Sequence, residues 1–289
     1  MTIDPSPPGG FVESADGTPI AWWPASPPAE TSAIEPGVPA LVLVHGATAD
    51  HTAFRAVAPR FAVHRPVITI DRRGRGASGD RLPYAIEREY EDVAAVVDWL
   101  AGSTGRPVDL LGHSFGGRCG LGAARLTANL RRLVVYEGAP APEGQAFQDP
   151  ALLARLDGLA ARGDLDGVMA AFMAEVVGLS PAEVEAYRRS PTWPIRAAAA
   201  PTAIRELRAE AGRDAGVEQL AEVRIPVLQL VGGDSPPIFS LGTRELDALL
   251  PDGRLANLTG QKHAAHHTDP LNFVAVVEGF LDDRDTIAP

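Results

Sequence analysis

Apolar residues along this chain follow two spacings. Short runs with few polar interruptions have the length of strands, and their lack of alternation indicates burial on both faces of a parallel sheet. These predicted strands are residues 40–44, 66–70, 108–111, 133–137, 226–231 and 254–258. Within 84–100 and 272–281, apolar side chains recur every three or four residues, which predicts amphipathic helices. Strands and helices therefore alternate, and this order predicts an α/β fold with a parallel sheet covered by helices.

Two further segments complete the predicted organisation. Residues 11–14 and 20–23 flank a turn and predict a hairpin, whereas residues 141–221 contain no strand pattern. Within the latter, Ser180-Pro-Ala-Glu183 matches a capping box with proline at the first helical position. We expect 141–221 to form an all-helical cap, or lid, inserted into a core made of 1–140 and 222–289.

Composition narrows the class of protein. The chain has 289 residues, of which 45% are hydrophobic, enough for the core of one large α/β domain. The net charge of −11 disfavours a nucleic-acid partner. No apolar stretch approaches the roughly 18 residues of a membrane span, and the first ten residues lack the pattern of a secretory signal. Cys119 is the single cysteine, which excludes an internal disulfide and suits the cytoplasm. Oligomeric state is not indicated.

The predicted strand 108–111 runs directly into Gly112-His-Ser-Phe-Gly116. This pattern is typical of a sharp strand-to-helix turn that exposes the hydroxyl of its serine, Ser114. A serine hydroxyl is a weak nucleophile by itself, so catalysis requires a histidine base, a carboxylate and donors for an oxyanion. The alternative is a glycine-rich turn with an inert serine, which requires none of these partners.

Suitable partners follow other predicted strands. Parallel sheets place reactive groups in the loops at the carboxyl ends of their strands. The residues found in such loops are His45, Ala47, Glu137, Asp234, His263, His266 and His267. A serine, two acids and several histidines are therefore expected at one edge of the sheet.

The motifs of this chain, and the order in which they occur, resemble those of the α/β-hydrolase family. The resemblance covers most of the chain and includes His45-Gly46, Asp71–Ser78, the serine turn, Gly233-Asp234 and Gly260-x-x-His263. The order serine, acid, histidine is the one that this family uses. The resemblance implies a mostly parallel sheet of about eight strands with helices on both faces, and catalysis without a cofactor.

His263 is the expected base, because it directly follows the last strand and Pro270 comes seven residues later. It would take the proton from Ser114 and deliver it to the leaving group. His266 and His267 are alternative bases. A metal site formed by the three histidines is an alternative, but no cysteine lies nearby and Ser114 needs a base, so we expect no metal.

Asp234 is the expected acid that orients the base, and Glu137 is the alternative. Some family members carry the acid after the strand that follows the serine, where Glu137 stands. Each also has a simpler interpretation. Asp234 precedes Ser235-Pro-Pro237 and suits a turn, whereas Glu137 suits a polar strand end that lines a pocket.

The oxyanion hole is expected from the backbone N–H groups of Ala47 and Phe115. His45 is expected to fix the loop that aims the Ala47 amide, rather than to act in catalysis. The arginines within 71–75 raise the possibility of phosphate binding, but Asp71 and the glycine turn favour a salt-bridged loop.

The expected reaction is hydrolysis of a carboxylic ester, lactone or thioester of a small apolar substrate, through an acyl-enzyme on Ser114. Apolar residues of the insertion suggest a roof over the substrate: Phe147, Phe172, Met173, Tyr187 and Trp193. Carbon–carbon bond hydrolysis, acyl transfer and perhydrolysis use the same three groups and remain alternatives. A hydrolase-like ligand sensor is a further alternative. Haloalkane and epoxide chemistry is disfavoured, because those relatives need an aspartate in place of Ser114.

Overall fold

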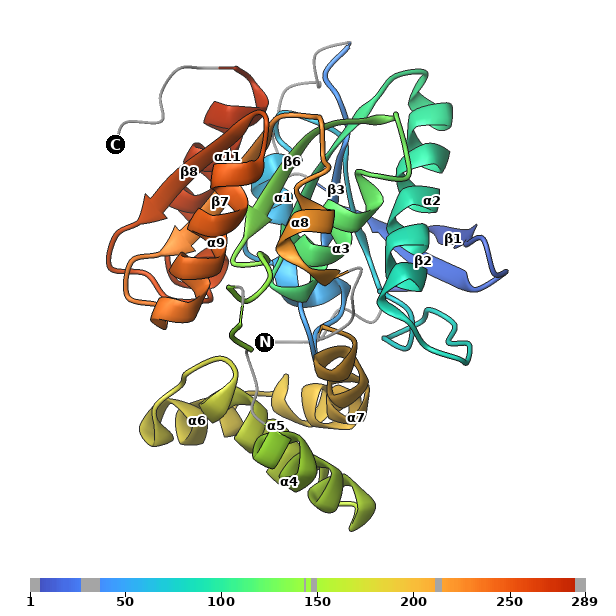
Figure 1. The fold of residues 1–289 in the computed structure, drawn as a ribbon. Coiled ribbons are helices and arrows are strands. Elements are labelled where there is room, and N and C mark those ends of the chain that lie inside the picture. The colour runs from blue at the N-terminus through green and yellow to red at the C-terminus, as the bar shows by residue number, and fades with distance from the viewer. Residues whose placement is uncertain (1–5, 27–36, 143, 147–149, 211–214, 284–289) are drawn as a thin grey trace.

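The structure is a computed structural model that describes residues 6–26, 37–142, 144–146, 150–210 and 215–283. Its centre is one eight-stranded sheet (Figure 1). The strands are β1 (Gly10–Glu13), β2 (Pro19–Pro24), β3 (Leu41–Val44), β4 (Val67–Ile70), β5 (Val108–His113), β6 (Leu130–Tyr136), β7 (Val227–Gly232) and β8 (Gly253–Leu258). The predicted strands and the hairpin are thus confirmed within a few residues at each end.

The strand order is β1-β2-β4-β3-β5-β6-β7-β8. The β1–β2 hairpin adds to the sheet antiparallel to β4, and every pairing from β4 to β8 is parallel. All residues of β3 and β4 are buried, which explains why their sequences are continuous apolar runs. The predicted α/β fold with a mostly parallel sheet is confirmed. Its serine, acid and histidine loops leave the carboxyl ends of β5, β6, β7 and β8.

Helices cover both faces of the sheet and bury a separate hydrophobic cluster on each. One face is covered by α2 (Ile86–Thr104), α3 (Phe115–Ala123), α8 (Val217–Leu220) and α9 (Pro237–Leu249). The other face is covered by η1 (His51–Phe54), α1 (Ala58–Phe61), α10 (Ala265–Thr268) and α11 (Pro270–Leu281). Within the described ranges, no helix is both long and apolar enough to cross a membrane.

Between β6 and β7 the described chain is helical. The helices are α4 (Pro150–Ala161), α5 (Leu165–Glu175), α6 (Pro181–Arg188) and α7 (Trp193–Ala209), and we call these four the cap. The cap has its own hydrophobic cluster and lies at one edge of the sheet (Figure 1). Its α6 begins with the predicted capping box, in which Ser180 accepts from the Glu183 backbone N–H and Glu183 accepts from that of Ser180. Helix α8 packs with the core instead, and the domain limits at 141 and 221 stay a prediction.

Buried ion pairs fasten the cap to the core. Arg72 and Arg75, in the loop after β4, both reach Glu206 on α7, at 2.9 and 2.6 Å. Arg72 also pairs with Glu89 on α2 at 2.9 Å. The predicted salt-bridged loop is confirmed, although its acids come from α2, α7 and the β1–β2 turn and not from Asp71. These arginines therefore belong to the framework of the protein.

Candidate active site

Ser114 occupies a strained position between β5 and α3, with φ 54° and ψ −128°. The turn is possible because two glycines let the backbones approach. A Cβ on Gly112 would lie 2.5 Å from the carbonyl oxygen of Gly116, and one on Gly116 would lie 2.3 Å from that of Val44. The Ser114 side chain does not cap α3, so its hydroxyl is left for other partners.

His263 has a carboxylate at its Nδ1, and that carboxylate belongs to Glu137. The Glu137 Oε2 lies 2.5 Å from Nδ1 of His263, and Glu137 Oε1 accepts from the backbone N–H of Gly232 at 2.7 Å. Glu137 is the first residue after β6, and its side chain is fully buried. Because β6 and β7 are neighbours, the end of β7 helps to fix the acid that faces the histidine.

The expectation that Asp234 orients His263 is corrected, because Glu137 occupies that position. Asp234 is exposed, and its backbone N–H donates to the carbonyl oxygen of Gln261 at 2.9 Å. Among the described residues no ion pair or side-chain hydrogen bond of Asp234 is found. The backbone of Gly232 to Ser235 turns at the end of β7, with the Ser235 N–H on the Gly232 carbonyl at 3.1 Å. Asp234 thus matches its simpler interpretation as a turn residue.

Two aromatic side chains fix the loop that carries His263. His113 makes a 2.8 Å hydrogen bond from Nε2 to the carbonyl oxygen of His263. The Tyr136 hydroxyl donates to the carbonyl of Lys262 and accepts from the N–H of Ala265 at 3.0 Å. Tyr136 was not expected from the sequence, and its only signal is its place immediately before Glu137. The ends of β5 and β6 therefore hold the histidine loop as well as the serine and the acid.

The other histidines here are neutral. Burial, together with neighbouring histidines and Arg196, holds the pKa of His113 and of His266 well below its ordinary value. Burial and the cations of Arg55 and Arg196 lower the pKa of His267 to about 4. A general base must carry a proton during the reaction, and protonation of these rings is costly. Within the described chain, no group of three or more His, Cys, Asp or Glu is arranged to hold a metal ion.

The loop after β3 brings Ala47 beside Ser114 and Phe115 at a small pocket that also contains His263. In the described chain, neither the Ala47 nor the Phe115 N–H donates to a backbone carbonyl, so both amides suit an oxyanion.

His45 fixes this loop. Its Nδ1 donates to the Gly46 carbonyl at 2.8 Å, and its Nε2 accepts from the Arg72 backbone N–H at 3.1 Å. Burial and the Arg72 cation keep the pKa of His45 well below its ordinary value, so the ring is neutral. Its predicted structural role is confirmed.

A cavity of about 370 Å³ lies between the core and the cap and includes Ser114 and His263 in its wall. Of the residues expected in an apolar roof, three line it: Phe172, Met173 and Tyr187. Trp193 instead lies buried within the cap, where its Nε1 donates to Asp166 at 2.6 Å. Phe147 lies outside the described residues. The cap thus supplies apolar surface opposite the serine.

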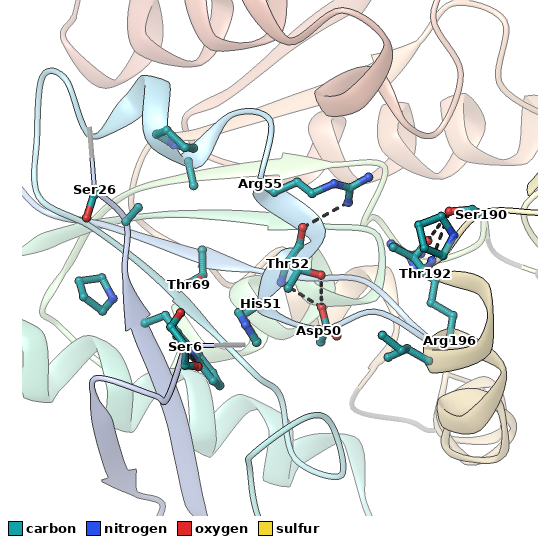
Figure 2. A pocket seen from close by; sticks show the side chains of 17 residues that line it. Ser6, Ser26, Asp50, His51, Thr52, Arg55, Thr69, Ser190, Thr192 and Arg196 are labelled. Atoms are coloured by element: carbon teal, nitrogen blue, oxygen red, sulfur yellow. Dashed lines mark hydrogen bonds between the residues drawn. The ribbon is translucent and has the colours of Figure 1, made fainter. Parts of the chain in front are cut away.

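A second cavity, of about 410 Å³, adjoins the first (Figure 2). It lies between the N-terminal strands, the η1 region and the cap, and includes Trp23 and His51. The residues that line both cavities are Arg55, Ser190, Thr192 and Arg196. Figure 2 shows Arg55 on the core side, and Ser190, Thr192 and Arg196 on the cap.

Sequence and structure comparisons agree with this geometry. The chain belongs to the Alpha/beta hydrolase family, whose sequence model matches residues 41–276. It is 29% identical over 272 residues to a pimeloyl-[acyl-carrier protein] methyl ester esterase of Neisseria meningitidis, covering 88% of this chain and 81% of that protein.

Solved structures show the same fold. An α/β hydrolase from Sphaerobacter thermophilus superposes with a TM-score of 0.78 at 34% identity, covering 93% of this chain and 99% of the other. An enol-lactonase from Burkholderia xenovorans superposes with a TM-score of 0.72 at 18% identity, covering 94% and 99%. The similarity to the enol-lactonase concerns the fold alone. The protein is therefore an α/β hydrolase with a helical cap.

Proposed function

We propose that the protein hydrolyses carboxylic esters, lactones or thioesters of small substrates, with Ser114 as nucleophile, His263 as base and Glu137 as the acid that orients the base. The observation that carries this proposal is the common cavity wall formed by Ser114 and His263, with Glu137 on the far nitrogen of the histidine. The similarity to a methyl ester esterase supports the ester bond as the target.

The proposed first step forms an acyl-enzyme. The Ser114 Oγ attacks the substrate carbonyl while His263 Nε2 takes its proton. The buried carboxylate of Glu137 stabilises the resulting imidazolium, and the amides of Ala47 and Phe115 stabilise the oxyanion. The intermediate then collapses: the bond between the carbonyl carbon and the leaving oxygen or sulfur breaks, and His263 returns its proton to the leaving group.

The second step releases the acid. A water molecule loses a proton to His263 Nε2 and attacks the acyl carbon, and the new oxyanion is stabilised by the same two amides. Collapse breaks the bond to Ser114 Oγ, which recovers its proton from His263. The products are a carboxylic acid and free enzyme. No cofactor takes part in these steps.

The test combines a fluorophosphonate probe with 4-nitrophenyl esters of graded chain length. We expect labelling of Ser114 in the purified protein, mapped by mass spectrometry, together with ester turnover. Both should be lost in Ser114→Ala and be strongly reduced in His263→Ala. Ser103→Ala is the matched control, because Ser103 is exposed on α2 and its hydroxyl donates to the Trp99 carbonyl of its own helix. Absence of both labelling and turnover in the wild type would reject the proposal and favour a ligand-binding role.

A further inference from the structure

The charge of the catalytic cavity has the opposite sign to that of the protein. The chain carries 37 acidic and 26 basic residues. Nevertheless, no described Asp or Glu lines the 370 Å³ cavity, whereas three cationic residues do: Arg55, Arg196 and Lys262. Such a distribution creates a positive potential inside an otherwise negative molecule.

Two of these cations have no acid partner in the part of the chain that the structure describes. Lys262 pairs with Glu183 at 2.8 Å. By contrast, no described carboxylate lies within ion-pair distance of Arg55 or Arg196. Within the described ranges, the exposed Arg55 makes a long hydrogen bond of 3.4 Å to the Thr52 carbonyl, and the guanidinium of the half-buried Arg196 lies 5.7 Å from the centre of the Tyr187 ring. Their donors are therefore available to a ligand.

The buried arginines of the framework differ from these two in being paired. The buried arginines of the framework, Arg72, Arg73 and Arg75, each have a carboxylate at 3.0 Å or less. Among its described lining residues the adjoining cavity has one acid, Asp50, whose carboxylate accepts from the backbone N–H and the hydroxyl of Thr52. The buried arginines that hold the fold are thus neutralised, whereas the exposed Arg55 and the half-buried Arg196, at the boundary between the cavities, have no described carboxylate beside them.

Neutral donors accompany the two arginines. Ser190 and Thr192 line both cavities with them, and their hydroxyl oxygens lie 2.9 Å apart. Arg55 comes from the core and Arg196 from the cap, so an anion between them would contact both parts of the protein (Figure 2). Met173, Val177 and Leu179 supply apolar wall to the same cavity as Ser114. A guanidinium is well suited to a carboxylate, which it can bind through two parallel hydrogen bonds.

We propose that the preferred substrate is an anionic ester, whose carboxylate binds between Arg55 and Arg196 while its ester carbonyl lies at Ser114. This inference rests on the proposed function and specifies its substrate class. The apolar segment between carboxylate and ester packs against the cavity wall of the cap. Arg55 and Arg196 are specificity-determining residues and take no part in bond breaking.

Matched pairs of esters test this proposal. Mono-4-nitrophenyl glutarate is compared with 4-nitrophenyl butyrate, which places the carboxylate in the acyl part. In the second pair, 4-(butyryloxy)benzoate is compared with 4-(butyryloxy)benzamide, which places it in the leaving group. We expect the anionic member of at least one pair to have a kcat/KM roughly 10- to 100-fold higher, the range expected for charged hydrogen bonds. The pair that shows the preference identifies the end of the substrate that carries the charge.

The measured quantity is the kcat/KM of the anionic ester divided by the kcat/KM of its neutral counterpart. A change in the site that affects both esters equally cancels in this ratio. Arg55→Gln and Arg196→Gln should each lower the ratio by about ten-fold or more. Arg189→Gln is the charge-matched control, since Arg189 is exposed on the cap and lines neither cavity. Ratios near one in the wild type, or ratios unchanged in both variants, would overturn the inference although ester hydrolysis itself stands.

Failure of the proposed function gives a different result, namely no hydrolysis of any of the four esters. Anion binding is then measured without turnover, by calorimetric titration with glutarate. Binding by the wild type that is weakened at least ten-fold in Arg196→Gln supports the anion site by itself. Absence of binding, or equal binding by both proteins, rejects it.

Discussion

Glu137 Oε2 lies 2.5 Å from Nδ1 of His263, although 126 residues separate the two in sequence. The contact follows from the sheet, because Glu137 is the first residue after β6 and His263 lies in the loop that follows β8. The other carboxylate oxygen of Glu137, Oε1, accepts from the Gly232 N–H at the end of β7. A carboxylate held by both a backbone amide and the imidazole has little freedom, so it fixes the ring orientation and the tautomer that leaves Nε2 free to accept a proton.

The first prediction separates the two acids. In Glu137→Gln, the amide can still accept from Gly232 but no longer supplies a negative charge to His263. We expect kcat on a 4-nitrophenyl ester to fall roughly 10³- to 10⁴-fold, the loss associated with a wrong histidine tautomer in such sites. Asp234→Asn should change kcat less than about two-fold, because Asp234 is an exposed turn residue. A large loss in Asp234→Asn with activity retained in Glu137→Gln would contradict this assignment.

The second prediction concerns the close backbone approach beneath Ser114. An added Cβ on Gly116 would lie 2.3 Å from the Val44 carbonyl oxygen and 2.4 Å from that of His45. Gly116→Ala should therefore lower the free energy of unfolding by about 3 kcal/mol or more, measured by urea denaturation. Gly102→Ala is the control, because Gly102 lies in α2 with no atom within 4 Å of the added Cβ. It should raise the free energy of unfolding by about 0.5–1 kcal/mol.

A third prediction tests how the cap is fastened. Glu206→Gln removes the charge shared by Arg72 and Arg75, both of which are buried. Loss of one partner from a buried pair should lower the free energy of unfolding by roughly 3–5 kcal/mol. Arg155→Gln breaks an exposed pair with Glu175 on the same cap and should cost about 1 kcal/mol or less. Equal melting temperatures for the two variants would show that the buried pairs do not anchor the cap.

The fourth prediction concerns acid stability. The pKa of His267 falls from 6.5 to about 4 on folding, mainly through burial and then through Arg55 and Arg196. Between these values the unfolded chain binds a proton that the folded protein does not. The contribution of neutral His267 is therefore complete above about pH 6.5 and decreases as the pH falls toward 4. Urea titrations at several pH values should give a shallower pH dependence for His267→Asn, by up to about 1.4 kcal/mol per pH unit in this window. Parallel curves for the variant and the wild type would refute the shift.

Most of the framework could be predicted from local pattern. Buried strands such as β3 and β4 are continuous apolar runs, and the elbow around Ser114 has a glycine at each position where backbones touch. His263 could be placed because it directly follows the last strand. The capping box at Ser180 depends on four consecutive residues, so it too was predictable. All these features depend on neighbours in sequence.

The acid could not be chosen in the same way. Glu137 and Asp234 both follow buried strands and are chemically equivalent candidates for the contact with His263. The choice depends on contacts between loops, because the Asp234 N–H bonds the Gln261 carbonyl while the Asp234 side chain is exposed. Arg55 and Arg196 were not predicted for a related reason. They line the same cavities because the cap lies over the core, and no short-range sequence pattern indicates that arrangement.

The position of Glu137 directly after β6 has a practical consequence for the loop that follows β7. The side chain of Asp234 is exposed and contributes no contact to the catalytic residues among the described ones. A cysteine introduced there can carry a fluorophore or a surface linker close to the active-site edge, while the native Cys119 is buried and shielded from the reagent. The protein thereby offers a site for selective labelling, suited to immobilised assays of the proposed hydrolysis and to optical reporting of ligand binding.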